Sequence, residues 1–177
     1  MLLIEKGVDY EHNKINVLAG GPREPEHLVR NPFGKVPVLE HEGMMIYETA
    51  AILDYVDTFF RGTSFTPTSV KDKVRMDMAV GIAGNFGAPT LVFGVAAYHL
   101  FPDFVGGQDE EKRQNSIVGG RLVLSEMMRL KGNSQYIAGD APSLGDLYLI
   151  PQVTYLAATP DADAVWNVIR GFQDWWS

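Results

Sequence analysis

Two short stretches of the sequence combine residue types that could bind a small peptide. In residues 31–39, N-P-F-G-K-V-P-V-L, Pro37 stands just before a run of strand-forming residues. Because proline cannot donate to a sheet ladder, it must lie at a strand start, an edge or a bulge. If the Val36–Pro37 bond is cis, the N–H and C=O of Val36 can face outward and pair with an extended peptide by strand addition. An ordinary turn proline is the alternative.

Glu48 and Thr49 form the second stretch, where a helical pattern follows directly on an apolar strand. The free N–H groups and the positive dipole end of a helix N-terminus favour a carboxylate. Glu48 could bind an ammonium group, and Thr49 adds a hydroxyl. A carboxylate and an ammonium on one carbon form the head group of an amino acid. The alternative for both residues is helix capping. The two stretches together indicate a peptide-like ligand more strongly than either does alone.

The elements that carry these stretches lie in the first third of the chain. A helix end capped by Gly7 in the left-handed conformation opens the sequence, and a hairpin turn is expected at 41–43. The other expected elements are an edge strand at 10–17, a helix at 26–30, strands at 36–40 and 44–47, and a helix from 48 whose apolar residues share one face.

The rest of the chain is predicted to be helical. Residues 61–69, R-G-T-S-F-T-P-T-S, have the composition of a linker. The expected helices run from about 70 to 98 with an interruption near 87–89, from 109 to 130, from 143, and from 164 to 176. We therefore expect an α/β domain at 1–60, a linker at 61–69 and an all-α domain at 70–177.

Composition excludes several classes of function. The chain has 177 residues, a net charge of −7 and no cysteine. An acidic chain is a poor partner for nucleic acid, and without cysteine it has neither a disulfide framework nor a thiolate nucleophile. The four histidines lack the spacing of a metal site, and no apolar run approaches the roughly 20 residues of a membrane helix. We expect a cytoplasmic protein without metal.

The two stretches also resemble the glutathione transferases. The string at 31–39, followed by the hairpin and by Y-E-T-A-A-I at 47–52, is similar to the glutathione-binding half of that family, and P-E-H-L-V-R at 25–30 resembles its phi class. The strings at 136–140 and 143–147, Y-I-A-G-D and S-L-G-D-L, are similar to the capping box of its helical domain. The resemblance implies an α/β thioredoxin-like domain followed by an all-α domain.

The resemblance assigns the glutathione contacts. Pro37 would be the cis proline, and the backbone of Val36 would pair with the cysteinyl unit. Glu48 and Thr49 would hold the γ-glutamyl head group.

Four further residues receive weaker assignments. Lys35 and Arg23 occupy the places of side chains that reach the glycyl carboxylate, with a solvated surface cation as the alternative for each. Phe86 and Phe93 could line an apolar pocket for the second substrate, with core packing as the alternative.

The thiolate-stabilising hydroxyl of the family has no counterpart in the sequence. A free thiol has a pKa near 8.5, so its thiolate needs stabilisation at neutral pH. In the phi class a serine between the first strand and the first helix supplies it, and Met1 already lies inside that helix. The absent strand would be the middle one, between 10–17 and 36–40. We expect the strand and the serine upstream of Met1 in the full polypeptide.

The resemblance implies conjugation of glutathione, as co-substrate, to an electrophilic, apolar compound, a detoxification reaction carried out by a homodimer. Peroxide reduction, isomerisation and ether cleavage on the same fold stay open. The alternative from another class is a non-catalytic binding or assembly module, because fold does not imply function.

Overall fold

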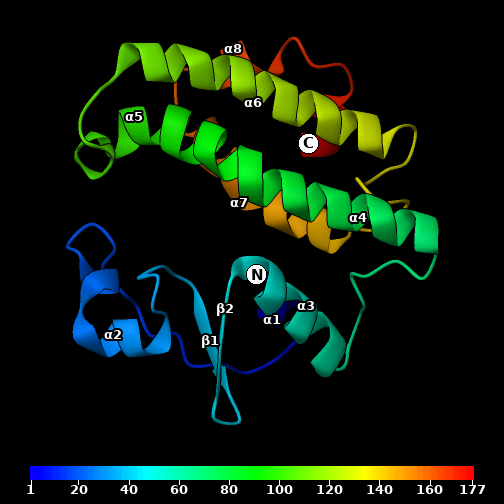
Figure 1. Cartoon of the computed structure of the whole chain (residues 1–177). Coiled ribbons are helices and arrows are strands. Elements are labelled where there is room, and N and C mark those ends of the chain that lie inside the picture. The colour runs from blue at the N-terminus through cyan, green and yellow to red at the C-terminus, as the bar shows by residue number, and fades with distance from the viewer. The chain divides into compact units, whose positions relative to one another are not determined.

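The computed structural model describes residues 1–177 and divides into two compact units, Met1–Ser64 and Phe65–Ser177 (Figure 1). The boundary falls inside the predicted linker at 61–69.

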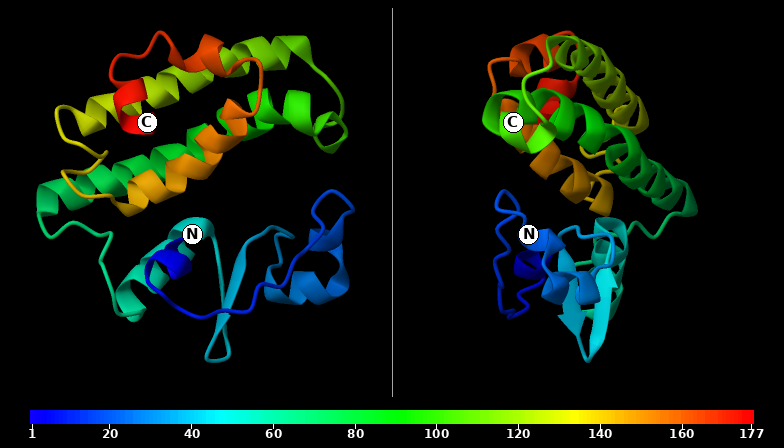
Figure 2. Two further views of the ribbon diagram at one scale, coloured as in Figure 1. Left: turned by 180° about the vertical axis from the view of Figure 1, so that it is seen from behind. Right: turned by 60° about the vertical axis from the view of Figure 1, so that its left-hand side comes forward.

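The first unit is a small α/β arrangement around one β-hairpin. Figures 1 and 2 show α1 and α3 on one side of the hairpin and α2 on the other. The elements are α1 (Leu2–Glu5), the 3-10 helix η1 (Gly21–Arg23), α2 (Pro25–Arg30), β1 (Val38–His41), β2 (Met44–Tyr47) and α3 (Thr49–Phe59).

The hairpin agrees with the sequence prediction. Strands β1 and β2 pair antiparallel, with Val38 opposite Tyr47. Glu42 and Gly43 in the turn both have positive φ, at 49° and 79°. Such a two-residue loop matches the right-handed twist of the strands. Strand β1 begins two residues later than predicted, after Pro37, which has no N–H to give to a ladder.

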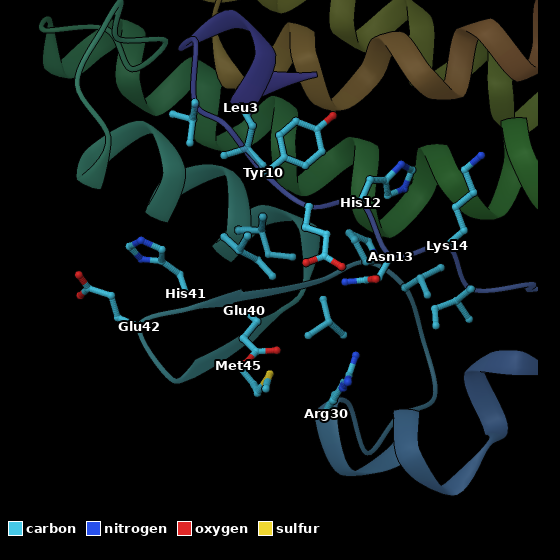
Figure 3. Close-up of a pocket in the computed structure, with 18 of the residues that line it drawn as sticks. Leu3, Tyr10, His12, Asn13, Lys14, Arg30, Glu40, His41, Glu42 and Met45 are labelled. Atoms are coloured by element: carbon cyan, nitrogen blue, oxygen red, sulfur yellow. The ribbon is translucent and has the colours of Figure 1, made fainter.

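The predicted edge strand at 10–17 is wrong. Residues 8–16 form no regular element, and no backbone N–H or C=O of residues 9–15 makes a hydrogen bond within the protein. A strand is defined by hydrogen bonds to a neighbouring strand. The sheet contains only β1 and β2, and neither pairs with this segment (Figure 3). Its polar side chains, such as those of Glu11 and Lys14, are exposed.

A buried ion pair joins the two helices on one side of the hairpin. Lys6, just after α1, lies with its Nζ 3.0 Å from Oδ1 of Asp57 on α3, and their side chains are only 1% and 2% exposed. The same Nζ donates to the carbonyl oxygens of Asp57 (2.9 Å) and Phe60 (3.1 Å). Gly7 follows at φ 64°, the left-handed cap expected from the sequence.

The second unit contains only helices, as predicted. Its core is built from buried residues of the long central helix and of α6, α7, α8 and α9. The elements are α4 (Val70–Ile82), the π-helix η2 (Ala83–Ala96), α5 (Ala97–Leu100), the 3-10 helix η3 (Pro102–Val105), α6 (Glu110–Lys131), α7 (Leu144–Ala157), α8 (Ala162–Trp166) and α9 (Phe172–Trp176).

The long central helix is continuous where an interruption was expected. Elements α4, η2 and α5 follow one another without a break, and Pro89 lies inside the π-helical part. By length and composition alone, Val70–Leu100 could cross a membrane, but the core helix of a folded domain passes the same test. Here Leu91 and Val95 are fully buried among the helices of the second unit.

Helix α7 starts at the predicted capping box. The carboxylate of Asp146 accepts hydrogen bonds from the N–H (2.9 Å) and the hydroxyl (2.7 Å) of Ser143. Its other oxygen accepts from the N–H of Ile137 (3.1 Å) and from Nε1 of Trp175 (2.8 Å). The carboxylate therefore fixes the helix start and two distant segments at once.

The single helix predicted at 164–176 is wrong, because the structure has two short helices there. Helix α8 ends at Trp166, and α9 begins only at Phe172. Gly171 between them has φ 79°, which a right-handed helix cannot contain.

Candidate functional site

The two chemically suggestive stretches meet at one end of the hairpin. Because Val38 pairs with Tyr47, the residues that precede β1 and follow β2 are cross-strand neighbours. These residues are Pro37 and Glu48. The Val36–Pro37 peptide bond is cis. The fold thus brings together Val36, Pro37, Glu48 and Thr49, four of the residues singled out in the sequence.

Two buried side chains form hydrogen bonds to the backbone just before Pro37. One belongs to α2, and the other to the residue that ends it. The carbonyl oxygen of Lys35 lies 2.8 Å from Nε2 of His27 and 3.0 Å from Nδ2 of Asn31. Since a carbonyl only accepts, the His27 nitrogen that faces it carries the proton. His27 and Asn31 are 5% and 1% exposed. Asn31 Oδ1 also accepts from the N–H of Phe33 (3.1 Å), which fixes the loop in between.

The next residue, Val36, offers its backbone to a ligand. Its side chain is exposed, and neither its N–H nor its C=O makes a hydrogen bond within the protein. A pair of free, outward-facing backbone groups on a fixed loop is the arrangement that strand addition requires.

Glu48 has an unusual backbone. Its φ is 68° and its ψ is 117°, a region that residues with a Cβ rarely adopt. Its side chain is exposed and makes no capping hydrogen bond, so the capping alternative is wrong for this residue. Strained residues of this kind cluster at functional sites.

The first turn of α3 leaves three N–H groups free. The first bond of the helix runs from the N–H of Ile52 to the carbonyl of Glu48 (3.0 Å), and the N–H groups of Thr49, Ala50 and Ala51 have no partner within the protein. Together with the helix dipole, they form a place for a carboxylate beside the Glu48 carboxylate.

Arg23, one of the two cations singled out in the sequence, lies against the residue that precedes the other, Lys35. Gly34 is buried at φ 59°, and a Cβ built there would come within 3.0 Å of the Arg23 side chain and 2.9 Å of the Pro22 carbonyl. Only glycine permits this approach, so Arg23 packs beside the residue that precedes Lys35. Both cations are exposed, and neither makes an ion pair within the protein.

Phe86 and Phe93 lie in the second unit, on η2. They are 60% and 45% exposed, so the core-packing alternative is wrong for both. Phe93 stacks on Phe104, with ring centroids 6.4 Å apart. Their role in a pocket for a second substrate stays a prediction.

Sequence reasoning missed the residues that position the site. The histidines were considered only as metal ligands, and Asn31 only as the first residue of the stretch 31–39. The available signal was their spacing: His27 and Asn31 are four apart across the end of α2, and such residues face the same side. No group of three or more His, Cys, Asp or Glu side chains could hold a metal ion.

Comparison with known proteins agrees with this geometry. Residues 1–58 match the family model described as "Glutathione S-transferase, N-terminal domain". Glutathione S-transferase F6 of Arabidopsis thaliana is 31% identical over 160 residues, which cover 89% of this chain and 76% of that protein. Maleylacetoacetate isomerase of Rhizobium meliloti is 30% identical over 159 residues, covering 89% and 74%.

A solved structure extends the similarity to the whole fold. Glutathione S-transferase I from mais, determined in complex with an atrazine glutathione conjugate, is 28% identical and has a TM-score of 0.81, covering 99% of this chain and 82% of that one. This likeness confirms the expected fold class, a thioredoxin-like domain followed by a helical domain.

Proposed function

Because this chain belongs to the glutathione S-transferase family, in which it is phi-class-like, we propose that it binds glutathione at the cis-proline end of the hairpin and conjugates it to an electrophile. One observation carries the proposal. The unpaired backbone of Val36 lies near Glu48, and Glu48 precedes the free N–H groups at the start of α3.

Each part of glutathione has a proposed partner among these residues. The N–H and C=O of Val36 would pair with the backbone of the cysteinyl unit. The N–H groups that open α3 would take the α-carboxylate of the γ-glutamyl unit, with Thr49 beside it, and Glu48 would take its ammonium group. Arg23 and Lys35 supply positive charge for the glycyl carboxylate at the other end. Each charged group of glutathione would therefore face a group of opposite charge.

The transfer step forms one bond and breaks one. The thiolate sulfur of glutathione attacks an electrophilic carbon of the second substrate, a carbon–sulfur bond forms, and the leaving group departs with its electron pair. Residues 23–49 orient the tripeptide for this attack.

The proposed second substrate is an apolar electrophile, of the kind detoxified by conjugation. The related mais enzyme was captured with a glutathione conjugate of atrazine, which supports an apolar aromatic substrate class. The related isomerase supports the competing possibility of isomerisation through a glutathione adduct. Phe86 and Phe93 are the apolar residues proposed for this substrate. We also propose a cytoplasmic homodimer, as is usual for the family.

Two measurements on one preparation test the proposal. The first is retention on immobilised glutathione with elution by free glutathione, and the second is turnover of a chloronitrobenzene followed by absorbance. We expect both retention and turnover. Retention without turnover would favour the non-catalytic binding module, and absence of retention would contradict glutathione binding altogether.

A further inference from the structure

A buried glutamine on α7 holds the first turn of the π-helix η2. Gln152 is 7% exposed, and its Nε2 donates to the carbonyl oxygen of Ala83 (3.1 Å), the first residue of η2. Because a carbonyl only accepts, the amide nitrogen must face Ala83 and the amide oxygen must lie elsewhere. That oxygen, Oε1, has no hydrogen-bond partner within the protein. The side chain therefore makes one hydrogen bond and leaves one buried acceptor unpaired.

The unpaired oxygen lies against a glycine further along η2. A Cβ built on Gly87 would collide with Gln152 Oε1, so only glycine leaves room for this oxygen. Gln152 thus contacts the π-helix at two points, Ala83 and Gly87. Phe86 lies between these two points in the chain, and its side chain is 60% exposed. Helix α7 therefore fixes the backbone that carries an exposed aromatic ring.

The same turn is held by a second side chain, from within η2. Thr90 Oγ1 donates to the carbonyl oxygens of Phe86 (2.6 Å) and Gly87 (3.3 Å). Hydroxyl bonds of this kind often bend helices. The methyl group of Thr90 packs against α6, because a Cβ built on Gly119 would come within 2.8 Å of it. The direction of the Phe86 ring is therefore set by contacts with both α6 and α7.

The unpaired oxygen of Gln152 costs free energy of folding. A methionine has a similar length and would fill the same space without burying an unpaired acceptor. Helices of the π type are rare, and they occur frequently at functional sites. A polar residue that lowers stability while it fixes such a segment fits a role in function better than a role in folding.

We infer that Gln152 is a positioning residue, which keeps the first turn of η2 π-helical and so directs Phe86 toward the second substrate. The inference rests on the proposed function, which assigns Phe86 to the apolar electrophile. Gln152 itself is buried and would not touch that substrate. Without its amide, residues 83–87 could relax from i→i+5 to i→i+4 hydrogen bonds, which would turn the Phe86 ring about the helix axis.

The variant Gln152→Met separates positioning from folding. Equilibrium dialysis gives the Kd of a chloronitrobenzene without requiring turnover or glutathione, and urea unfolding gives the stability. We expect the Kd to rise roughly threefold or more, while the midpoint of unfolding stays unchanged or rises. Phe86→Ala, which removes the ring itself, should also weaken binding. Gln114→Met, the same change at an exposed glutamine of α6, should leave the Kd unchanged.

A second variant tests the contact with Gly87. The new Cβ of Gly87→Ala should displace the glutamine amide and weaken chloronitrobenzene binding as Gln152→Met does. Because both changes break the same contact and a methionine side chain is flexible, the double variant should bind no more weakly than either single variant. Additive losses in the double variant would overturn the inference.

Failure of the inference can be distinguished from failure of the proposed function. Absence of retention on immobilised glutathione contradicts the proposed function, and the dialysis measurement does not depend on it. The inference would be overturned by a parent chain that does not bind the chloronitrobenzene, or by a Phe86→Ala or Gln152→Met chain that binds it as the parent does. A loss of both binding and stability in Gln152→Met would also overturn it, because that result describes a structural residue.

Discussion

The imidazole Nε2 of His27 lies 2.8 Å from the carbonyl oxygen of Lys35, and this contact fixes the backbone that presents Val36. The histidine is 5% exposed and does not lie on the surface offered to the ligand. It acts as a positioning residue, because its effect on a ligand would pass through the loop that it holds.

Replacing His27 by Ala is expected to weaken glutathione binding without removing any ligand contact. The Lys35 carbonyl would keep Asn31 as a donor and lose one hydrogen bond, which is worth about 0.5–1.5 kcal/mol and which holds the loop that presents Val36. Calorimetric titration with glutathione checks this. The exposed His12→Ala serves as the control, and unchanged affinity in His27→Ala would mean that Asn31 alone holds the loop.

Removing Lys6 is expected to destabilise the first unit strongly. Lys6→Met leaves the carboxylate of Asp57 buried beside an apolar side chain, and breaking a buried pair in this way costs about 3–5 kcal/mol. Arg129→Met removes an exposed pair with Glu126 and should cost less than about 1 kcal/mol. Urea unfolding measures the free energy of unfolding of the two variants. Similar decreases in both would contradict a larger contribution from the buried Lys6 pair.

Two glycines of the central helix are expected to respond oppositely to alanine. A Cβ on Gly94 would collide with the Ser116 side chain on α6, whereas one on Gly81 would meet nothing within 4 Å. Gly81→Ala should stabilise the chain by about 0.5–1 kcal/mol through helix propensity. Gly94→Ala should lower the free energy of unfolding. Thermal unfolding of both variants tests this, and stabilisation by Gly94→Ala would contradict the packing described.

Stability is expected to fall below about pH 4.5 partly because of Glu110. Its carboxylate accepts from Arg113 Nε (2.9 Å) and Nη2 (2.6 Å) and from Gln114 (2.9 Å). These hydrogen bonds, with that of Arg113 largest, lower the pKa of Glu110 from 4.5 to about 2. A lowered pKa stabilises the folded state above pH 4.5, and the contribution is lost as the pH falls toward 2.

Urea unfolding at several pH values between 5 and 2 checks this dependence. The variant Glu110→Gln should show a shallower loss of stability over that range than the parent chain. Because Glu110 is exposed, high salt should reduce the difference between them. Identical pH profiles at low salt would contradict the assignment.

The parts of the structure that sequence predicted well are those set by local chemistry. The hairpin turn at Glu42 and Gly43, the left-handed Gly7 and the capping box of Ser143 and Asp146 all depend on residues a few positions apart. The proximity of Pro37 and Glu48 could also be predicted, because a short hairpin places the residue before its first strand beside the residue after its second.

The parts that sequence could not predict depend on distant partners. A strand at 10–17 needs a neighbouring edge within reach, which no local pattern reports. The pairing of Lys6 with Asp57 spans 51 residues, and the passage of the helix through Pro89 depends on π-helical geometry. The roles of His27 and Asn31 required knowing that the loop folds back over α2.

The most direct test of the central claim is the dissociation constant of glutathione for the parent chain and for Glu48→Ala, measured by calorimetry. We predict binding by the parent chain and a loss of about 1.5–3 kcal/mol in the variant, roughly 10- to 150-fold in Kd, because a charged hydrogen bond to the ammonium group is removed. Glu42→Ala, an acidic residue with similarly positive φ in the hairpin turn, should bind as the parent does. Equal affinity of Glu48→Ala and the parent chain would contradict the site described.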